Sequence, residues 1–146
     1  MENLVSTRLV ARIAALVLLT LPISACGDHA KNPDNELPSG VVDVPKAGDA
    51  LQPGRTLVGG WAVDDSAVLE IRIYFDGRYR TSTSLNVPRP DVAKALPRYA
   101  RRGDIHGWNA LIDFGMAAGP HTILIQAVDD SGATRDIGVI PVTVPQ

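Results

Sequence analysis

An acidic motif that occurs twice supplies the side chains best suited to bind a cation. Residues 62–66 read AVDDS, and residues 127–131 read AVDDS again. Carboxylate oxygens are the ligands that calcium takes in proteins, so the two copies together form a candidate calcium site. Its residues are Asp64, Asp65, Asp129 and Asp130.

Turn formation is the competing explanation of this motif, and it is the one we favour. Asp and Ser side chains hydrogen-bond to nearby backbone amides and so stabilise turns, and each copy stands where a strand is expected to end. Turn chemistry explains either copy alone. We therefore expect no metal ion and no bound cofactor at these residues.

A run of basic residues between positions 86 and 104 is the second candidate site. The segment reads NVPRPDVAKALPRYARRGD, in which Lys and Arg outnumber Asp. Such a surface is suited to an anionic glycan, a lipid headgroup or an acidic protein partner, although isolated charge runs more often face water. The candidate partner-binding residues are Arg89, Lys94, Arg98, Tyr99, Arg101 and Arg102.

Catalytic patterns are missing from the sequence. His106 and His121 follow no zinc-site spacing, and structural roles are favoured for both. The chain contains no G-x-S-x-G motif, no phosphate-binding loop and no Cys/His pairing. We therefore expect a protein that is not an enzyme.

The amino terminus predicts export. Arg8 and Arg12 precede a short apolar run at residues 13–21, and small residues follow, which is the plan of a secretory signal peptide. The run is too short to cross a hydrocarbon core of about 30 Å as a helix. An ordinary signal peptide with a chance cysteine would share these features.

The only cysteine, Cys26, ends the sequence Ile-Ser-Ala-Cys. This sequence resembles the lipobox of bacterial lipoproteins, in which the cysteine sulfur is diacylated and the chain is cut just before it. The resemblance implies a signal peptide over residues 1–25, with diacylglycerol and a fatty acyl chain on Cys26. It also implies a lipid anchor in a bacterial membrane, on the exported side of the cell envelope.

Composition limits the number of domains and the kinds of function that the rest of the chain can have. The chain has 146 residues and a net charge of -2, which is material for one domain and argues against nucleic-acid binding. A single cysteine excludes an internal disulfide framework. Residues 26–40 are almost devoid of apolar side chains, so we expect the acylated cysteine to be followed by a flexible tether and the domain to span residues 41–146.

Hydrophobic side chains alternate with period two after residue 40, which predicts strands rather than helices. Residues 69, 71, 73 and 75 are expected on one buried face, and Asp76-Gly77 predicts a two-residue type I′ hairpin. Pro141 requires an edge strand or a bulge. A helical turn is expected at residues 91–96 in the long connection. The predicted strands are 41–44, 56–63, 68–75, 78–84, 106–114, 121–128 and a last one ending in PVTVPQ.

About seven short strands of this kind fit an all-β antiparallel sandwich. Five motifs occur in an order that resembles a bacterial immunoglobulin-like module of secreted and surface proteins: GWAVDD, IRIYFDG, RPDV, GPH and AVDDSG. The resemblance covers residues 41–146 and implies a spacer or adhesion scaffold with no catalytic residues. The cysteine pair of antibody domains is absent, and Trp61 falls on the second strand.

These features together predict a membrane-anchored lipoprotein with a non-catalytic immunoglobulin-like binding or spacer domain facing the periplasm or the cell exterior. The alternative is an accessory subunit that docks onto an envelope enzyme or transporter. The expected partners are the membrane, reached through the anchor, and an envelope protein or an anionic glycan.

Strand directions also predict where the candidate residues meet. Counting strands up and down the sandwich places both AVDDS turns and the start of the long connection at the same end. We expect Arg89, held between Pro88 and Pro90, to pair with one of the turn carboxylates, because a guanidinium can make two parallel bonds to a carboxylate.

Overall fold

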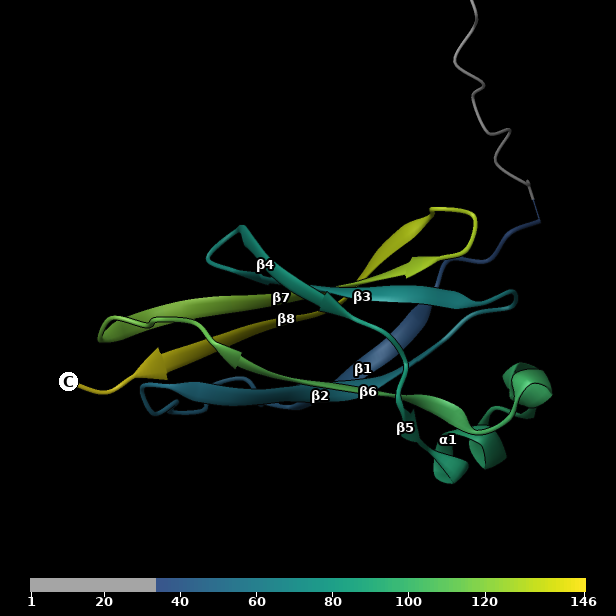
Figure 1. Cartoon of the computed structure of the whole chain (residues 1–146), viewed down its shortest axis with the longest axis horizontal. Coiled ribbons are helices and arrows are strands. Elements are labelled where there is room, and N and C mark those ends of the chain that lie inside the picture. The colour runs from purple at the N-terminus through teal and green to yellow at the C-terminus, as the bar shows by residue number, and fades with distance from the viewer. Residues whose placement is uncertain (1–33) are drawn as a thin grey trace, which may run out of the picture. The chain divides into compact units, whose positions relative to one another are not determined.

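Two antiparallel four-stranded sheets pack face to face (Figure 1). The computed structural model describes residues 34–146, so the predicted signal peptide and Cys26 lie outside the described residues. The first sheet has the order β1 (Ser39–Val44), β2 (Arg55–Val63), β6 (Ile105–Asp113) and β5 (Val87–Pro88). The second has the order β4 (Arg78–Thr83), β3 (Val68–Phe75), β7 (Gly119–Asp129) and β8 (Thr134–Val144).

This topology confirms the predicted sandwich. The order of the first sheet matches the ABED sheet of an immunoglobulin domain, and β3, β7 and β8 match its CFG sheet. Every predicted strand is present, with bounds within a few residues of those expected. For the last strand, β8, the sequence predicted only the final residues, and the strand begins earlier, at Thr134. The additional strand, β5, has two residues and is too short to show a periodicity.

The core lies between the sheets, where the inward side chains of both layers meet. Ile71 and Ile73 on β3 and Trp108 on β6 are almost completely buried. Phe75 stacks on Phe114, with 4.6 Å between the ring centroids. Burial of each such side chain contributes about 2 kcal/mol, so this interior supplies most of the drive to fold.

The hairpin between β3 and β4 has the predicted turn. Asp76 has φ of 49° and Gly77 has φ of 74°. Two consecutive residues with positive φ are the signature of the type I′ turn, and Asp-Gly is a preferred pair for it.

Leu69 departs from the predicted pattern, because its side chain is 60% exposed. The pairing of β3 with β7 shifts register between Val68 and Glu70, which marks a β-bulge. A bulge adds one residue to a strand and so breaks the alternation of its faces. Val68 packs against the core in place of Leu69.

Strand β8 accommodates Pro141 because it is the last strand of its sheet. Pro141 lies opposite Thr122 of β7 and has no amide hydrogen to offer a further strand. The prediction that Pro141 requires an edge or a bulge is confirmed.

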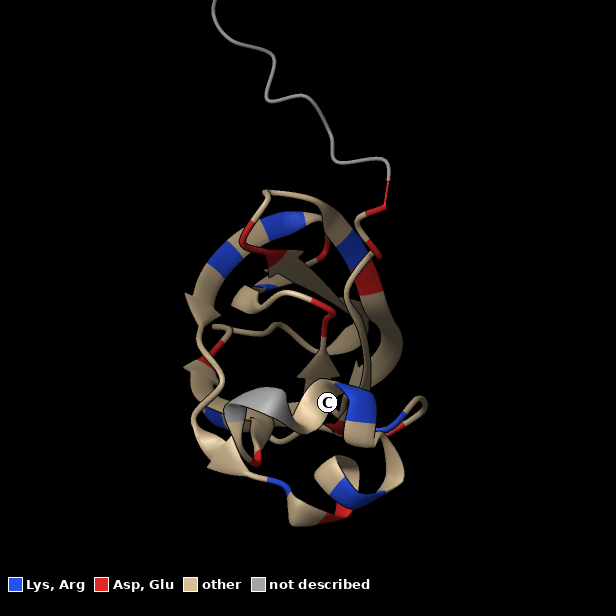
Figure 2. Cartoon of the chain, turned by 90° about the vertical axis from the view of Figure 1, so that its right-hand side faces the viewer, with Lys and Arg blue, Asp and Glu red and all other residues tan. Residues whose placement is uncertain are grey.

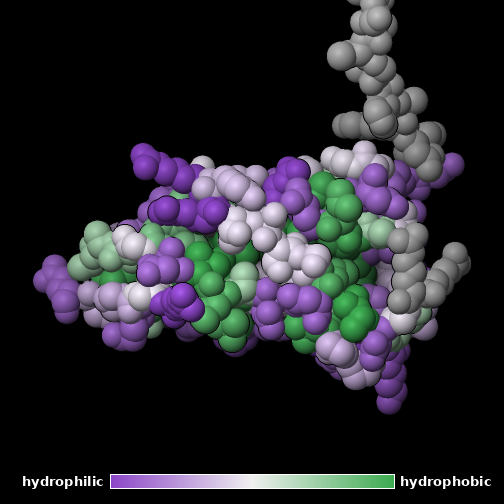
Figure 3. Space-filling model, viewed as in Figure 1, coloured by the Kyte–Doolittle hydropathy of each residue, from purple (hydrophilic) through white to green (hydrophobic). Residues whose placement is uncertain are grey.

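The sandwich side formed by β4, β5 and β6 is not closed by strand pairing. Thr83 donates its hydroxyl hydrogen to Asn109 O at 3.2 Å, and Arg80 donates to Phe114 O at 3.3 Å. These bonds link the two sheets through side chains. Figure 3, viewed as Figure 1, shows hydrophobic side chains reaching the surface on the side that faces the viewer.

The long connection holds the helical turn expected of it. Helix α1 (Pro90–Ala95) is followed by the 3₁₀ helix η1 (Pro97–Arg102), and a proline opens each of them. Proline suits the first helical position because its missing amide hydrogen would have no partner there. Within residues 34–146, no helix is long and apolar enough to span a bilayer.

A pair of substitutions on β3 tests the bulge. Ile73→Ala should lower the free energy of unfolding by about 3 kcal/mol, because it leaves a cavity in the core. Leu69→Ala should change it by less than about 0.5 kcal/mol, because the side chain is on the surface. Urea unfolding of both variants checks this, and equal losses would contradict the bulged register.

Candidate functional site

The two acidic turns lie side by side at one end of the sandwich, as the strand directions predicted. Ser66 Oγ lies 2.5 Å from Asp130 Oδ1, and the Asp130 amide donates to Ala67 O at 3.0 Å. We call this the loop end. Figure 2 views the sandwich from the right-hand side of Figure 1, with acidic residues in red and basic residues in blue.

Both turns are built in the same way. Asp64 Oδ1 accepts hydrogen bonds from the amide and the hydroxyl of Ser66, at 2.9 and 2.7 Å. Asp129 Oδ1 accepts the equivalent bonds from Ser131, also at 2.9 and 2.7 Å. These bonds confirm the turn interpretation of the repeated motif.

The two aspartates differ in their remaining hydrogen-bond partners. Asp129 is completely buried, its Oδ1 also accepts from the Ala133 amide at 2.8 Å, and its Oδ2 accepts from Asn35 Nδ2 at 2.8 Å. Burial alone would raise the pKa of Asp129, but the bonds from Asn35, Ser131 and Ala133 outweigh it and lower the pKa.

Asp64 lacks a comparable set of hydrogen bonds to offset the effect of burial on its pKa. Its side chain is 8% exposed, and its Oδ2 is buried without a hydrogen-bond partner. Burial raises the pKa of Asp64 more than the two bonds from Ser66 lower it, and the charges of Asp65 and Asp129 raise it further. Asp64 is therefore a buried carboxylate that is only half satisfied.

His106 shares a hollow of about 190 Å³ with Asp64. His106 is 6% exposed, and its Nε2 is also buried without a partner. The pairing of Trp61 with Gly107 places the end of β2 beside the start of β6, which brings Asp64 and His106 to the same end. Ser66, Leu85, Tyr99 and Ile105 also line the hollow.

Sequence reasoning missed this hollow. It placed His106 on an inward face and assigned it a structural role, without connecting it to Asp64. The register of β2 against β6 was the missing information, since the two residues are far apart in the chain. Among residues 34–146, no three His, Cys, Asp or Glu side chains are grouped so that they could hold a metal ion.

Arg89 does not pair with the turn carboxylates, so that prediction is wrong. It donates to Asp43 Oδ2 at 2.7 Å and to Asp91 Oδ2 at 2.8 Å. Hydrogen bonding to Arg89 lowers the pKa of Asp91 to about 2.

The reason for this pairing is the path of the Arg89 side chain. A Cβ at Gly107 would lie 2.8 Å from Arg89 Cγ, so the arginine lies directly over that glycine of β6. From there it reaches across the outer face of the sheet to Asp43, which sits at a bulge in the opposite edge strand, β1.

Arg98 and Tyr99 are held by a residue that precedes β1. Arg98 donates two bonds to the Glu36 carboxylate, at 3.1 and 2.9 Å, and the Tyr99 hydroxyl donates to Glu36 at 3.0 Å. Asn35 and Glu36 thus contact the loop end although they fall in the segment predicted as tether, and β1 begins at Ser39, before the predicted boundary.

The candidate partner-binding residues whose side chains the structure describes therefore form no single open cationic surface. Acidic side chains pair with Arg89 and Arg98, whereas Lys94 is exposed. The side chains of Arg101 and Arg102 lie outside the described part of the chain.

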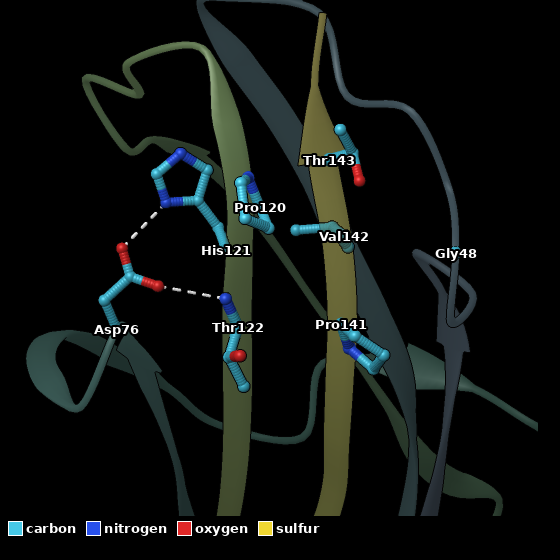
Figure 4. A pocket seen from close by; sticks show the side chains of 8 residues that line it. All are labelled: Gly48, Asp76, Pro120, His121, Thr122, Pro141, Val142 and Thr143. Atoms are coloured by element: carbon cyan, nitrogen blue, oxygen red, sulfur yellow. Dashed lines mark hydrogen bonds and ion pairs between the residues drawn. The ribbon is translucent and has the colours of Figure 1, made fainter.

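A second hollow, of about 290 Å³, lies at the opposite end of the sandwich (Figure 4). His121 Nδ1 lies 2.8 Å from Asp76 Oδ2, and His121 Nε2 lies 2.8 Å from Ala117 O. These two bonds raise the pKa of His121. Because both ring nitrogens face acceptors, this histidine braces the chain and has no nitrogen left to act as a base.

Comparison with known proteins supports the fold alone. No protein-family model matches the sequence, and no curated protein matches it significantly. Among solved structures it is similar to the fibronectin(III)-like modules of Clostridium thermocellum CbhA, with 17% identity and a TM-score of 0.52. The match covers 75% of this chain and 47% of that one, so the chain spans about half of its length. The chain has an immunoglobulin-like or fibronectin-like β-sandwich fold.

The two aspartates should respond oppositely to removal of their charge. At pH 7, Asp64→Asn should raise the free energy of unfolding by about 1 kcal/mol, because its raised pKa means that the folded state disfavours the charged form. Asp129→Asn should lower it by about 2 kcal/mol, because its lowered pKa means that the folded state favours the charge.

Urea unfolding measures both changes, and exposed Asp65→Asn is the control, expected within about 0.5 kcal/mol of the unmodified protein. Both effects should shrink as the pH falls and the carboxyl groups protonate. A loss of stability in Asp64→Asn would show that its second oxygen has a stabilising partner.

His121 should make stability depend on pH in the opposite sense to Asp129. A raised pKa means that its contribution is complete below the ordinary value of 6.5 and is lost as the pH rises through the folded-state value. The difference in unfolding free energy between the unmodified protein and His121→Gln should therefore shrink above neutral pH. Asp76→Asn should reduce this pH dependence without abolishing it, because the bond between His121 and Ala117 O remains. A difference that grows with pH would contradict the assignment.

Proposed function

We propose that the chain is a lipid-anchored, non-catalytic β-sandwich module of a bacterial cell envelope, with a binding site at its loop end. The Ile-Ser-Ala-Cys sequence supports the anchor, and the apolar run before it supports export. Acyl chains on Cys26 would hold the module at a membrane surface, since each buried methylene contributes about 0.8 kcal/mol.

The binding site rests on one observation, the pair of unpartnered buried atoms at the loop-end hollow. Asp64 Oδ2 and His106 Nε2 belong to residues that line the same hollow. Buried polar atoms are nearly always hydrogen-bonded, and exceptions call for a missing partner or a functional role. A domain that served only as a spacer would gain nothing from keeping a carboxylate half satisfied.

The second candidate is an accessory subunit that docks onto an envelope enzyme or transporter. Leu57 and Leu111 favour it, because they lie opposite each other on β2 and β6 and are 53% and 58% exposed. Exposed apolar side chains that adjoin one another are typical of protein contact surfaces. This surface is on the outer face of the first sheet and is separate from the hollow.

Crosslinking in intact cells, combined with metabolic fatty-acid labelling, tests the proposal. The unmodified protein should incorporate the label, fractionate with membranes and crosslink to a ligand or partner. Cys26→Ala should lose both label and membrane fractionation. Asp64→Asn and His106→Gln should keep the label but lose the crosslink, with Asp65→Asn as the matched control that keeps both.

Each arm has a result that contradicts it. Label on the Cys26→Ala protein would exclude the anchor. A crosslink that survives in Asp64→Asn and His106→Gln but disappears in Leu57→Ser with Leu111→Ser would favour the accessory subunit. A fully labelled protein with no crosslink at all would indicate a spacer.

A further inference from the structure

Two residues that line the loop-end hollow each have a buried polar atom that the fold leaves without a hydrogen-bond partner. Asp64 and His106 are each more than nine-tenths buried, and neither Asp64 Oδ2 nor His106 Nε2 has a partner. A carboxylate oxygen can only accept, and a neutral imidazole with its proton on Nδ1 presents Nε2 as a second acceptor. A hydrogen-bond donor would therefore satisfy Asp64 Oδ2, and it would also satisfy His106 Nε2 when the imidazole proton is on Nδ1.

Charge at this place favours a cation over a neutral donor. Ser66 has one hydroxyl hydrogen, yet its Oγ lies 2.7 Å from Asp64 Oδ1 and 2.5 Å from Asp130 Oδ1. Two carboxylates thus compete for one proton. No described Lys or Arg side chain forms an ion pair with Asp64, so a neutral hydroxyl in the hollow would leave its buried charge uncompensated.

The form of the acceptor favours an ammonium over a guanidinium or a metal ion. A guanidinium binds best when both oxygens of one carboxylate are free, and Asp64 Oδ1 is occupied by Ser66. Calcium takes six to eight oxygen ligands, far more than one free carboxylate oxygen supplies. An ammonium has three donors and no acceptor, so it can donate to acceptors on two different residues at once.

The walls fit an aliphatic stem behind that ammonium. Val68, Leu85 and Ile105 line the hollow with apolar side chains, and Tyr99 adds an aromatic one. A volume of about 190 Å³ admits a slender group and excludes a bulky ligand. Lysine buries its methylene stem along apolar surface in this way while its head group stays paired.

We propose that the loop-end hollow binds a primary ammonium group carried on an aliphatic stem, with Asp64 Oδ2 and His106 Nε2 accepting from its nitrogen. This proposal rests on the binding function proposed above and names its ligand class. A lysine side chain of a partner protein and a free alkylamine share this chemistry.

Titrations followed by amide NMR on the full-length protein in detergent test the proposal. The probes are n-butylamine for a free amine and Nα-acetyl-lysine amide for a side chain. At least one should bind saturably and shift the signals of Tyr99, Ile105 and His106. Tighter binding of the lysine probe than of butylamine would identify a protein partner as the source, and the reverse a free amine.

Matched probes and variants give the test its controls. n-Butanol has the same stem without the charge, and Nα-acetyl-arginine amide carries a guanidinium; both should bind about tenfold more weakly or not at all. Asp64→Asn, which should fold at least as well as the unmodified protein, should weaken amine binding about tenfold or more. Asp65→Asn removes the same charge from an exposed neighbour and should leave binding unchanged.

The outcomes separate this proposal from the one on which it rests. Equal binding of butanol, preference for the arginine probe, a response only to calcium chloride, or no response to either amine would each overturn the ammonium assignment. If amines fail but Asp64→Asn still abolishes the crosslink in cells, the binding function stands with a different ligand. If the crosslink also survives in Asp64→Asn, the loop-end site itself is wrong.

Discussion

The hydrogen bonds that Asp64 Oδ1 accepts from Ser66 hold the point at which the chain leaves one sheet and enters the other. Ser66 also contacts Asp130, so this crossing is tied to the turn between β7 and β8. The register of β2 against β6 brings His106 to the same end, where Asp64 and Ser66 of this crossing line the hollow with it. One side-chain turn thus ties together the two sheets and the two acidic turns at the loop end.

The two copies of the AVDDS motif differ in the hydrogen-bond partners that surround their first aspartate. Asp129 is surrounded by donors and stabilises its turn in the charged form, whereas Asp64 makes the same turn but keeps one oxygen unused. The contrast is informative because the local sequence is identical, so the difference comes from the neighbours. Proteins commonly retain such unsatisfied groups where function requires them, at a cost in stability.

Local chemistry was readable from the sequence, and contacts between distant segments were not. Alternation predicted the inward side chains of β3 from Ile71 onward but misplaced Leu69, because a bulge leaves no mark on a hydrophobic pattern. Strand directions predicted that the two acidic turns meet. The partner of Arg89 depends on the lateral order of the strands, and the role of Glu36 was hidden in a polar segment that composition describes as tether.

The chain enters the sandwich at the loop end, where Asn35 contacts Asp129, and leaves it at the opposite end, where Val144 pairs with Gly119 (Figure 1). A force that pulls these two points apart acts along the strands, whereas the hydrogen bonds between antiparallel strands run across them. The bonds joining β1 to β2 and β8 to β7 are then loaded together in shear rather than opened one after another. We therefore expect the arrangement that leaves the hollow at one end to make the domain resistant to tension along its length.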